Sequence, residues 1–283
     1  MLYRVRCSGY DAGCAEEAAV LVDVHFHPVD PDMDPDCHAV MARARAAGVG
    51  AAIAAAWDAA SCLSTVALAR ATAGVAAAVG FHPWYVHQGW DTGLVEREAA
   101  RDFVVAVGEI GLDGKIETPL EEQARAFDAQ LGLAGRLGLP VIVHSRHAFD
   151  ATLSAARRFP AVTGVLHSFG GSTQTAAGFL DLGYCFSFSG SVTRPEARRV
   201  HELAAYLPED RILLETDAPS IGMQGLEARH VEPMHVPRVL AALARVRRCD
   251  IESLAAATTR NALAAFPRLS RCLALERKAA GDE

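Results

Sequence analysis

The stretch LVDVHFH, residues 21–27, is an apolar, strand-like run that ends in two histidines. Further short apolar runs follow it in order, each ended by a polar break and followed by a longer stretch with helical spacing. Several are rich in Val, Ile or Phe, as buried parallel strands are. The later runs are VGAAIAAAW (49–57), GVAAAVGFH (74–82), FVVAVGEIG (103–111), PVIVHS (140–145), TGVLHSF (163–169), YCFSFSG (184–190) and RILLETD (211–217).

The segments between these runs predict helices. The clearest covers residues 119–138, where Pro119 stands in the first turn and Gly138 follows the end. Further helices are predicted over 148–158, 172–182, 195–206 and 236–247. The second and third apolar runs are so alanine-rich that they could pass for helix, and their place in the order predicts strands.

Eight strands alternating with helices predict an α/β fold, a TIM (β/α)8 barrel, whose usual size is roughly 250 residues. The alternative is an open doubly wound sheet, which normally carries a glycine fingerprint after its first strand. That place holds DVHFHPVD (23–30), so the sequence favours the barrel. We expect an irregular N-terminal extension over 1–20, a single barrel catalytic domain over 21–270 and a frayed C-terminal tail over 271–283.

The composition excludes several classes of protein. With 51% hydrophobic residues in 283, the bulk of the chain cannot be disordered. The net charge of -7 disfavours sequence-independent binding along duplex DNA, so any nucleic acid should be engaged locally. The 7 cysteines include no CxxC pair, which indicates neither a disulfide framework nor a cysteine zinc site.

No secretory or membrane-spanning segment is predicted. The first residues, MLYRVRCSGYDAGCAEE, mix charge and glycine where a secretory signal would be apolar. The longest stretch without Asp, Glu, Lys or Arg covers 159–180, and it contains Pro160, His167 and several Gly, Ser and Thr residues. We therefore expect a cytoplasmic protein.

Polar residues suited to catalysis stand at the ends of five runs. Residues two apart on a strand point the same way, so His25 and His27 project to one side. In a barrel that side can be the C-terminal mouth, where active sites are built. The other runs carry imidazole or carboxylate at the same relative depth: Glu109 in GEIGLD, His144 in HSR, His167 in HSF, and Glu215 with Asp217 in ETD.

Histidines and carboxylates buried together favour bound cations, because burying them uncompensated would be costly. Nitrogen and oxygen ligands from His, Glu and Asp suit divalent Zn, Mn, Mg, Co or Fe(II). The set exceeds what one ion with an open position needs, so we expect two divalent ions bridged by a carboxylate. Such a pair can activate a water and clamp both oxygens of an ester being displaced. The predicted ligands are His25, His27, Glu109, His144, His167 and Asp217.

The remaining histidines and the common catalytic motifs add less. His82 follows the third run in GFHPW and faces the same mouth, where it should contact substrate or support a ligand. The pair His201-Glu202 fails the HExxH zinc motif, because residue 205 is Ala. The sequence contains no GxSxG elbow and no P-loop.

These segments, in this order, resemble the TatD-type metal-dependent hydrolases (TatD DNases), a branch of the amidohydrolase-like TIM barrels. DVHFH is similar to the family's opening D-x-H-x-H, GFHPW to its G-x-H-P and VGEIGLD to its GEIGLD. LGLPVIVHSR and GVLHSFGGS resemble its fifth-strand and sixth-strand signatures. FSFSGSVT, LLETDAP and the stretches 233–236 and 258–266 complete a resemblance that covers residues 21 to about 267.

The resemblance implies how the ligands are divided. His25, His27 and Asp217 hold one ion, His144 and His167 hold the second, and Glu109 bridges. Family members hydrolyse ester bonds, most often as 3′→5′ exonucleases or DNases on single-stranded or damaged DNA. The implied activity is that of a TatD-like deoxyribonuclease, a phosphodiesterase-type enzyme that uses a metal-activated water on single-stranded DNA ends. Asp217 and Glu109 would be its catalytic residues, with Asp217 also accepting a proton.

Further residues are assigned around the ligands. Glu215 lies two residues before Asp217 on the same side of its strand, where it would support a ligand. Arg146 is a candidate phosphate contact, because a guanidinium matches two phosphate oxygens; a structural ion pair is its alternative. Trp84 could stack on a base or pack at the barrel rim, and with His82 it is assigned to substrate binding.

Departures from the family pattern concern the substrate rather than the ligands. Trp84 stands where the family often has His or Tyr, Ser168 where it usually has Cys, and SIGMQG (220–225) where many members have an aromatic and a basic loop. Two alternatives stay open. One is a D-aminoacyl-tRNA deacylase or other carboxylic ester or amide hydrolase on the same site, which the acidic net charge favours. The other is a non-catalytic metal-binding scaffold.

Overall fold

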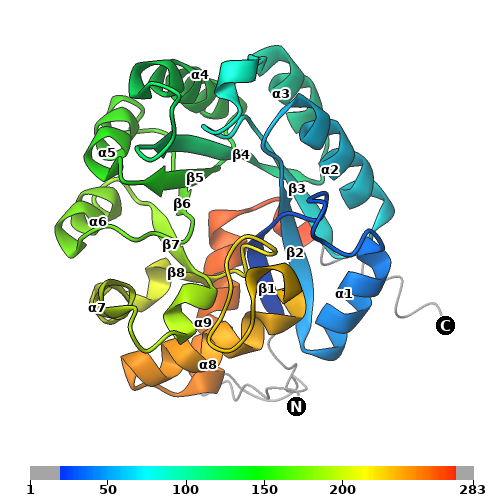
Figure 1. Cartoon of the computed structure of the whole chain (residues 1–283), viewed down its shortest axis with the longest axis vertical. Helices are drawn as coiled ribbons and strands as arrows, with labels where there is room; N and C mark the ends of the chain where they lie inside the picture. The colour runs from blue at the N-terminus through cyan, green and yellow to red at the C-terminus, as the bar shows by residue number, and fades with distance from the viewer. Residues whose placement is uncertain (1–19, 272–283) are drawn as a thin grey trace, which may run out of the picture.

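The chain folds into a ring of parallel strands surrounded by helices (Figure 1). The computed structural model describes residues 20–271, so the predicted extension and tail lie outside the described residues except for one residue each. Each strand pairs in parallel with the next in an 8-stranded sheet, which confirms the predicted barrel. The strands are β1 Leu21–Phe26, β2 Val49–Ala55, β3 Val75–Val79, β4 Val104–Asp113, β5 Val141–Arg146, β6 Gly164–Leu166, β7 Cys185–Phe188 and β8 Ile212–Leu214.

Helices α1 to α8 follow the strands and cover the outside of the ring, while α9 comes directly after α8 and packs against β8 and β1 (Figure 1). They are α1 Cys37–Ala46, α2 Ala59–Ala71, α3 Thr92–Ala99, α4 Leu120–Leu137, α5 Phe149–Arg158, α6 Thr173–Leu180, α7 Arg198–Tyr206, α8 Val236–Arg247 and α9 Ile251–Ala265. Gly138 ends α4 as predicted, in a left-handed conformation with φ 62°. α7 begins at Arg198, later than the predicted 195, because residues 194–197 form a turn in which the N–H of Ala197 donates to the carbonyl of Arg194. Among the described helices, none has the length and apolar composition needed to cross a membrane.

β2 and β3 are strands despite their alanine content. Every residue of both strands is buried. Their backbones pair with β1, with each other and with β4. Pairing on both edges therefore overrides the helix preference of alanine.

The core has an outer layer between strands and helices and an inner layer inside the ring. Ile142, Val165 and Leu213, on β5, β6 and β8, belong to the inner layer together with residues of α9. Side chains alternate along a strand, so the residues two further on face the same interior, nearer to the ends of the strands. His144, on β5, and His167, directly after the end of β6, lie at these positions.

The ring is closed by the segment that follows β8. β1 and β8 are the two ends of the described strand order. The N–H of Asp217 donates to the carbonyl of His25 at 2.9 Å. The buried carboxylate of Asp23 accepts the N–H of Thr216 at 2.9 Å and also its hydroxyl. Closure therefore brings His25 and Asp217 to the same part of the mouth, the opening at the C-terminal ends of the strands.

Candidate active site

The buried carboxylate of Glu109, on β4, lies at the centre of the mouth. Its Oε1 lies 2.8 Å from His167 Nε2 and 3.0 Å from His144 Nδ1. Its Oε2 lies 3.2 Å from His25 Nε2 and 3.5 Å from His27 Nε2. The two oxygens of one carboxylate therefore face two separate histidine pairs.

The first pair, His25 and His27, is completed by Asp217. The two Nε2 atoms are 3.1 Å apart, and Asp217 Oδ1 lies 3.3 Å from that of His27 and 3.6 Å from that of His25. Metal–ligand bonds of about 2.0–2.1 Å in a tetrahedral site place neighbouring ligands about 3.3 Å apart, which these separations match. Asp217 has φ 52°, in the left-handed region that non-glycine residues rarely adopt and that concentrates at functional sites.

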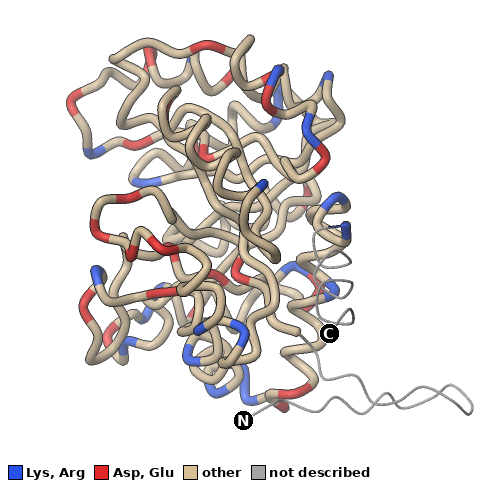
Figure 2. The backbone as a smooth tube through the Cα atoms, turned by 90° about the vertical axis from the view of Figure 1, so that its right-hand side faces the viewer, with Lys and Arg blue, Asp and Glu red and all other residues tan. Residues whose placement is uncertain are grey.

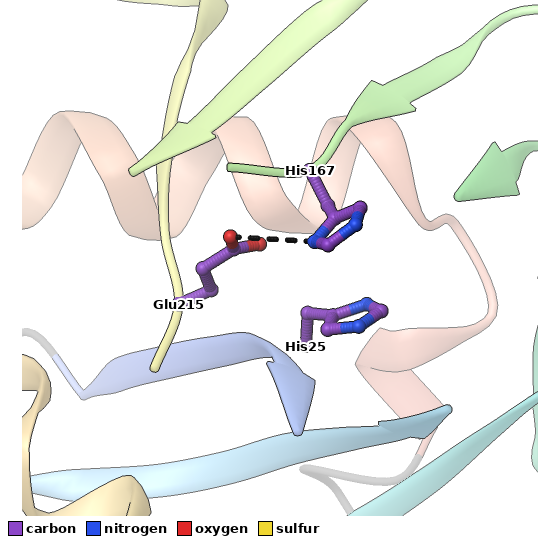
Figure 3. Close-up of side chains that lie close together, drawn as sticks. All are labelled: His25, His167 and Glu215. Atoms are coloured by element: carbon purple, nitrogen blue, oxygen red, sulfur yellow. Dashed lines mark ion pairs between the residues drawn. The ribbon is translucent and has the colours of Figure 1, made fainter. Parts of the chain in front are cut away.

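The second pair, His144 and His167, has carboxylates behind its rings. His144 Nδ1 and His167 Nε2 are 3.2 Å apart. Asp113 Oδ2 lies 3.0 Å from the other nitrogen of His144, and Glu215 Oε1 lies 3.7 Å from that of His167. Figure 3 shows Glu215 pointing at His167, whose ring stacks on that of His25 with centroids 4.3 Å apart. Carboxylates in this position orient metal-ligating histidines.

The backbone permits a close approach of β4 to β5 beside this pair. Gly111 has φ 146°, and a Cβ at this position would overlap the carbonyl oxygen of His144. Only glycine combines this conformation with such an approach. The glycine thus lets the ends of β4 and β5 come together.

The charges of the cluster favour a bound cation. Burial alone would raise the pKa of the Glu109 carboxyl, but the charge of His167 and a hydrogen bond from His144 hold that pKa well below its usual range. Burial alone would lower the pKa of His27, but the carboxylates of Asp217 and Glu109 raise it to about 8. Asp217 Oδ1 is a buried atom with no hydrogen-bond partner of ordinary geometry. Ionised carboxylates that attract positive charge, set among imidazole nitrogens, fit a divalent ion.

His82 enters the cluster as a hydrogen-bond donor. Its Nδ1 accepts the backbone N–H of Trp84 at 3.1 Å, which leaves the proton of the neutral ring on Nε2. Nε2 lies 3.2 Å from Glu109 Oε1 and donates to it. Burial lowers the pKa of His82 to about 4, so the ring is neutral at pH 7. His82 therefore supports Glu109, and its Nε2 is not a free donor for an ion.

Asp113, to which the sequence analysis assigned no role, connects His144 to Trp84 and Arg146. Its Oδ2 accepts the N–H of Trp84 Nε1 at 2.7 Å and that of Arg146 Nε at 2.8 Å. Arg146 thus forms the ion pair considered as its alternative role, while its side chain stays 45% exposed. Asp113 follows Glu109 by an even number of positions on one strand, and this alternation is the signal that could have placed it at the site.

The cluster opens into a cavity of about 450 Å³. This volume falls within the range of roughly 300–1,000 Å³ typical of small-molecule sites. The wall includes both aromatic rings and guanidinium groups: Trp57, Trp84, Tyr85, Arg146 and Arg199. Of the residues assigned from sequence, the structure brings all the predicted ligands together around Glu109 and Asp217, with Glu215 behind them and His82, Trp84 and Arg146 around the cavity.

A barrel with this cluster at its mouth is typical of metal-dependent hydrolases. The family model described as TatD related DNase matches residues 22–267. The chain therefore belongs to the TatD-related DNase family, as the sequence motifs indicated.

Relatives from two bacteria match most of the chain. Escherichia coli (strain K12) YjjV is 38% identical over 253 residues, covering 87% of this chain and 97% of the relative. Bacillus subtilis (strain 168) YabD is 30% identical over 252 residues, covering 87% and 99%. Both are named as uncharacterized metal-dependent hydrolases.

Solved structures show the same architecture. The crystal structure of YjjV superposes with a TM-score of 0.83 at 35% identity, covering 88% of this chain and 98% of that one. A TatD family hydrolase from Entamoeba histolytica superposes with a TM-score of 0.77 at 17% identity, covering 88% and 98%. The second likeness is one of fold alone.

Proposed function

We propose that the chain is a divalent-metal-dependent deoxyribonuclease that removes nucleotides from the 3′ ends of single-stranded DNA. The observation that carries the proposal is the position of Glu109, whose two oxygens face two different histidine pairs. Two ions bridged by a carboxylate can hold both the attacking and the leaving oxygen of a phosphodiester. Membership of a family described as TatD related DNase supports the same class of substrate.

The donor atoms divide between two ions. We assign one ion to His25, His27 and Asp217, the other to His144 and His167, and both to Glu109. When bound, such ions supply Lewis acidity and a water of lowered pKa. Glu215 supports His167 from 3.7 Å, and His82 supports Glu109 from 3.2 Å.

Asp217 is assigned as a ligand and as the acceptor of the water's proton. In the reaction a water oxygen adds to phosphorus, the bond from phosphorus to the 3′ oxygen breaks, and that oxygen takes up a proton. The products are a nucleoside 5′-monophosphate and a strand shortened by one nucleotide. Asp217 is buried and lines the cavity, where its carboxylate can accept a proton from a reacting group.

The mouth suits the end of a nucleic acid strand. Arg146 is held to Asp113 through Nε, which leaves its terminal nitrogens for a phosphate. Trp84 is 44% exposed and offers a ring face to a base. Figure 2 shows acidic and basic residues interleaved along the chain, in keeping with a net charge of -7 and with local engagement of DNA. A cytoplasmic location remains a prediction from the sequence.

The test is an activity comparison on the purified full chain. A single-stranded DNA labelled near its 5′ end and a D-aminoacyl-tRNA are each incubated with Mg²⁺, Mn²⁺, Co²⁺ or Zn²⁺, and with a chelator. We expect a ladder of DNA products shortened from the 3′ end, and no ladder with the chelator. Release of the amino acid with intact DNA would replace the nuclease by a deacylase on the same site.

Ligand variants decide whether the cluster performs the reaction. His144→Ala and Asp217→Ala should abolish hydrolysis with the fold intact, and the exposed His38→Ala, on α1, is the matched control. Wild-type rates from a folded His144→Ala or Asp217→Ala protein would overturn the ligand assignment.

A further inference from the structure

The side chain of Asp113 collects donors from three sides at the end of β4. It is fully buried. Its Oδ2 lies 2.7 Å from Trp84 Nε1, 2.8 Å from Arg146 Nε and 3.0 Å from His144 Nε2. One oxygen atom thus contacts a residue of the metal cluster and both exposed residues assigned to substrate.

The position of this carboxylate is fixed from behind. Its Oδ1 accepts the backbone N–H of Lys115 at 2.9 Å. Gln123, buried on α4, accepts the N–H of Asp113 at 2.8 Å and donates to its carbonyl at 3.0 Å. Hydrogen bonds hold both the backbone and the side chain of Asp113, so Asp113 sets the positions of the groups that donate to it.

The contact with His144 determines which nitrogen of that ring is free. A carboxylate accepts hydrogen bonds, so His144 carries a proton on Nε2 when it faces Asp113. In the neutral ring the lone pair is then on Nδ1, which lies 3.0 Å from Glu109 Oε1 and 3.2 Å from His167 Nε2. Asp113 thereby presents the correct nitrogen of His144 to the cluster.

The contacts with Trp84 and Arg146 set the wall of the cavity. The indole and guanidinium both donate to the same oxygen, and Arg146 Cζ lies 5.3 Å from the centroid of the Trp84 ring. This arrangement leaves the terminal nitrogens of Arg146 and one face of Trp84 for a ligand. The wall and the histidine therefore share one anchor.

We propose that Asp113 is a positioning residue that couples the His144 side of the metal cluster to the phosphate- and base-contacting wall formed by Arg146 and Trp84. The inference rests on the proposed two-ion function and adds a residue to it. Asp113 contacts the cluster through His144. It acts through the tautomer of His144 and through the placement of Arg146.

The first test measures binding of Mn²⁺ alone by calorimetry. His144→Ala identifies which of the two wild-type binding events belongs to the ion on the His144 side of the cluster. Asp113→Asn should weaken that event by about 10- to 100-fold, the usual effect of losing a residue that orients a ligand, and leave the other unchanged. Glu98→Gln is the matched control, because Glu98, on α3, is also buried and pairs with Arg101, which lies just beyond the end of that helix.

The second readout is kinetic. Asp113→Asn should raise the KM for single-stranded DNA about tenfold through loss of the Arg146 anchor, and lower kcat through His144. Arg146→Met should reproduce the rise in KM. It changes no predicted ligand, and it should increase the affinity for Mn²⁺ only in the binding event that His144→Ala identifies, because Asp113 then accepts more strongly from His144. The Arg146→Met measurement stands even if Asp113→Asn does not fold.

The outcomes separate the two proposals. Wild-type Mn²⁺ affinities in a folded Asp113→Asn protein, or in Arg146→Met, would overturn the coupling while leaving the nuclease intact. A wild-type protein that binds no Mn²⁺ would overturn the two-ion function and the coupling together. Equal weakening of both events in Asp113→Asn would contradict a role exerted through His144.

Discussion

Replacing Glu109 by glutamine removes one charge from the centre of the cluster and keeps the size of the side chain. Each of its oxygens faces a different histidine pair, at 2.8 Å from His167 on one side and 3.2 Å from His25 on the other. If Glu109 bridges two ions, Glu109→Gln must weaken both binding events. His144→Ala and Asp217→Asn should each weaken mainly one.

The size of the effect follows from the removal of one charged donor from each ion. Losing a residue that only orients a ligand typically costs 10- to 100-fold in metal affinity. Losing a charged donor should lower the binding affinity for each ion by at least the upper end of this range, about 100-fold or about 2.7 kcal/mol. The product of the two association constants should then fall by about four orders of magnitude.

The assay is calorimetric titration of the metal-free full chain with Mn²⁺. Wild type, the three cluster variants and Glu98→Gln are compared at one pH, and circular dichroism confirms that each is folded. Weakening of both events in Glu109→Gln and of neither in Glu98→Gln is the predicted result. A folded Glu109→Gln protein that loses a single event would refute the bridge.

Three further predictions concern the wall, the ions and the fold. Arg146→Ala should lower kcat/KM for single-stranded DNA by about 10- to 100-fold, the value of a charge-assisted hydrogen bond, and far less for a neutral carboxylic ester; equal losses on both substrates would rule out a phosphate contact. Mn²⁺ at 100 times its Kd should stabilise the protein by about 2.7 kcal/mol per site, or raise Tm by about 5–10 °C over chelator-treated protein. A thermal scan checks this, and identical Tm values would contradict ion binding by the folded state. Asn261→Ala should destabilise by about 2–4 kcal/mol in urea, because Asn261 Nδ2 donates to the carbonyls of Glu209 (2.7 Å) and Ile212 (2.9 Å). The exposed neighbour Arg260→Ala is its control, and equal stabilities would show that those hydrogen bonds contribute nothing.

Much of the fold is visible in the sequence because strands and helices have different periods. Apolar runs ended by polar breaks located β1 to β8, alternation within the first run placed His25 and His27 on one side, and His144 and His167 were placed by standing at the ends of their runs. Even the alanine-rich β2 and β3 followed from their place in the order. The helix preference of alanine alone would predict helices at these positions. They are strands because neighbouring strands pair with both of their edges.

The parts that the sequence did not predict depend on contacts between segments distant in the chain. Asp113 receives donors from Trp84 and Arg146, far from it in sequence. The proton on His82 Nε2 follows from a backbone N–H that only the folded turn supplies. Closure of the ring through Asp23 and Thr216 likewise joins the beginning of the barrel to its end. No local pattern encodes such pairs.

Crystals of the full chain grown with Mn²⁺ and measured for anomalous scattering would show whether two ions share Glu109. We expect two peaks, one beside His25, His27 and Asp217 and one beside His144 and His167, each next to a different oxygen of Glu109. A single peak, or two peaks of which one lies away from Glu109, would contradict this arrangement.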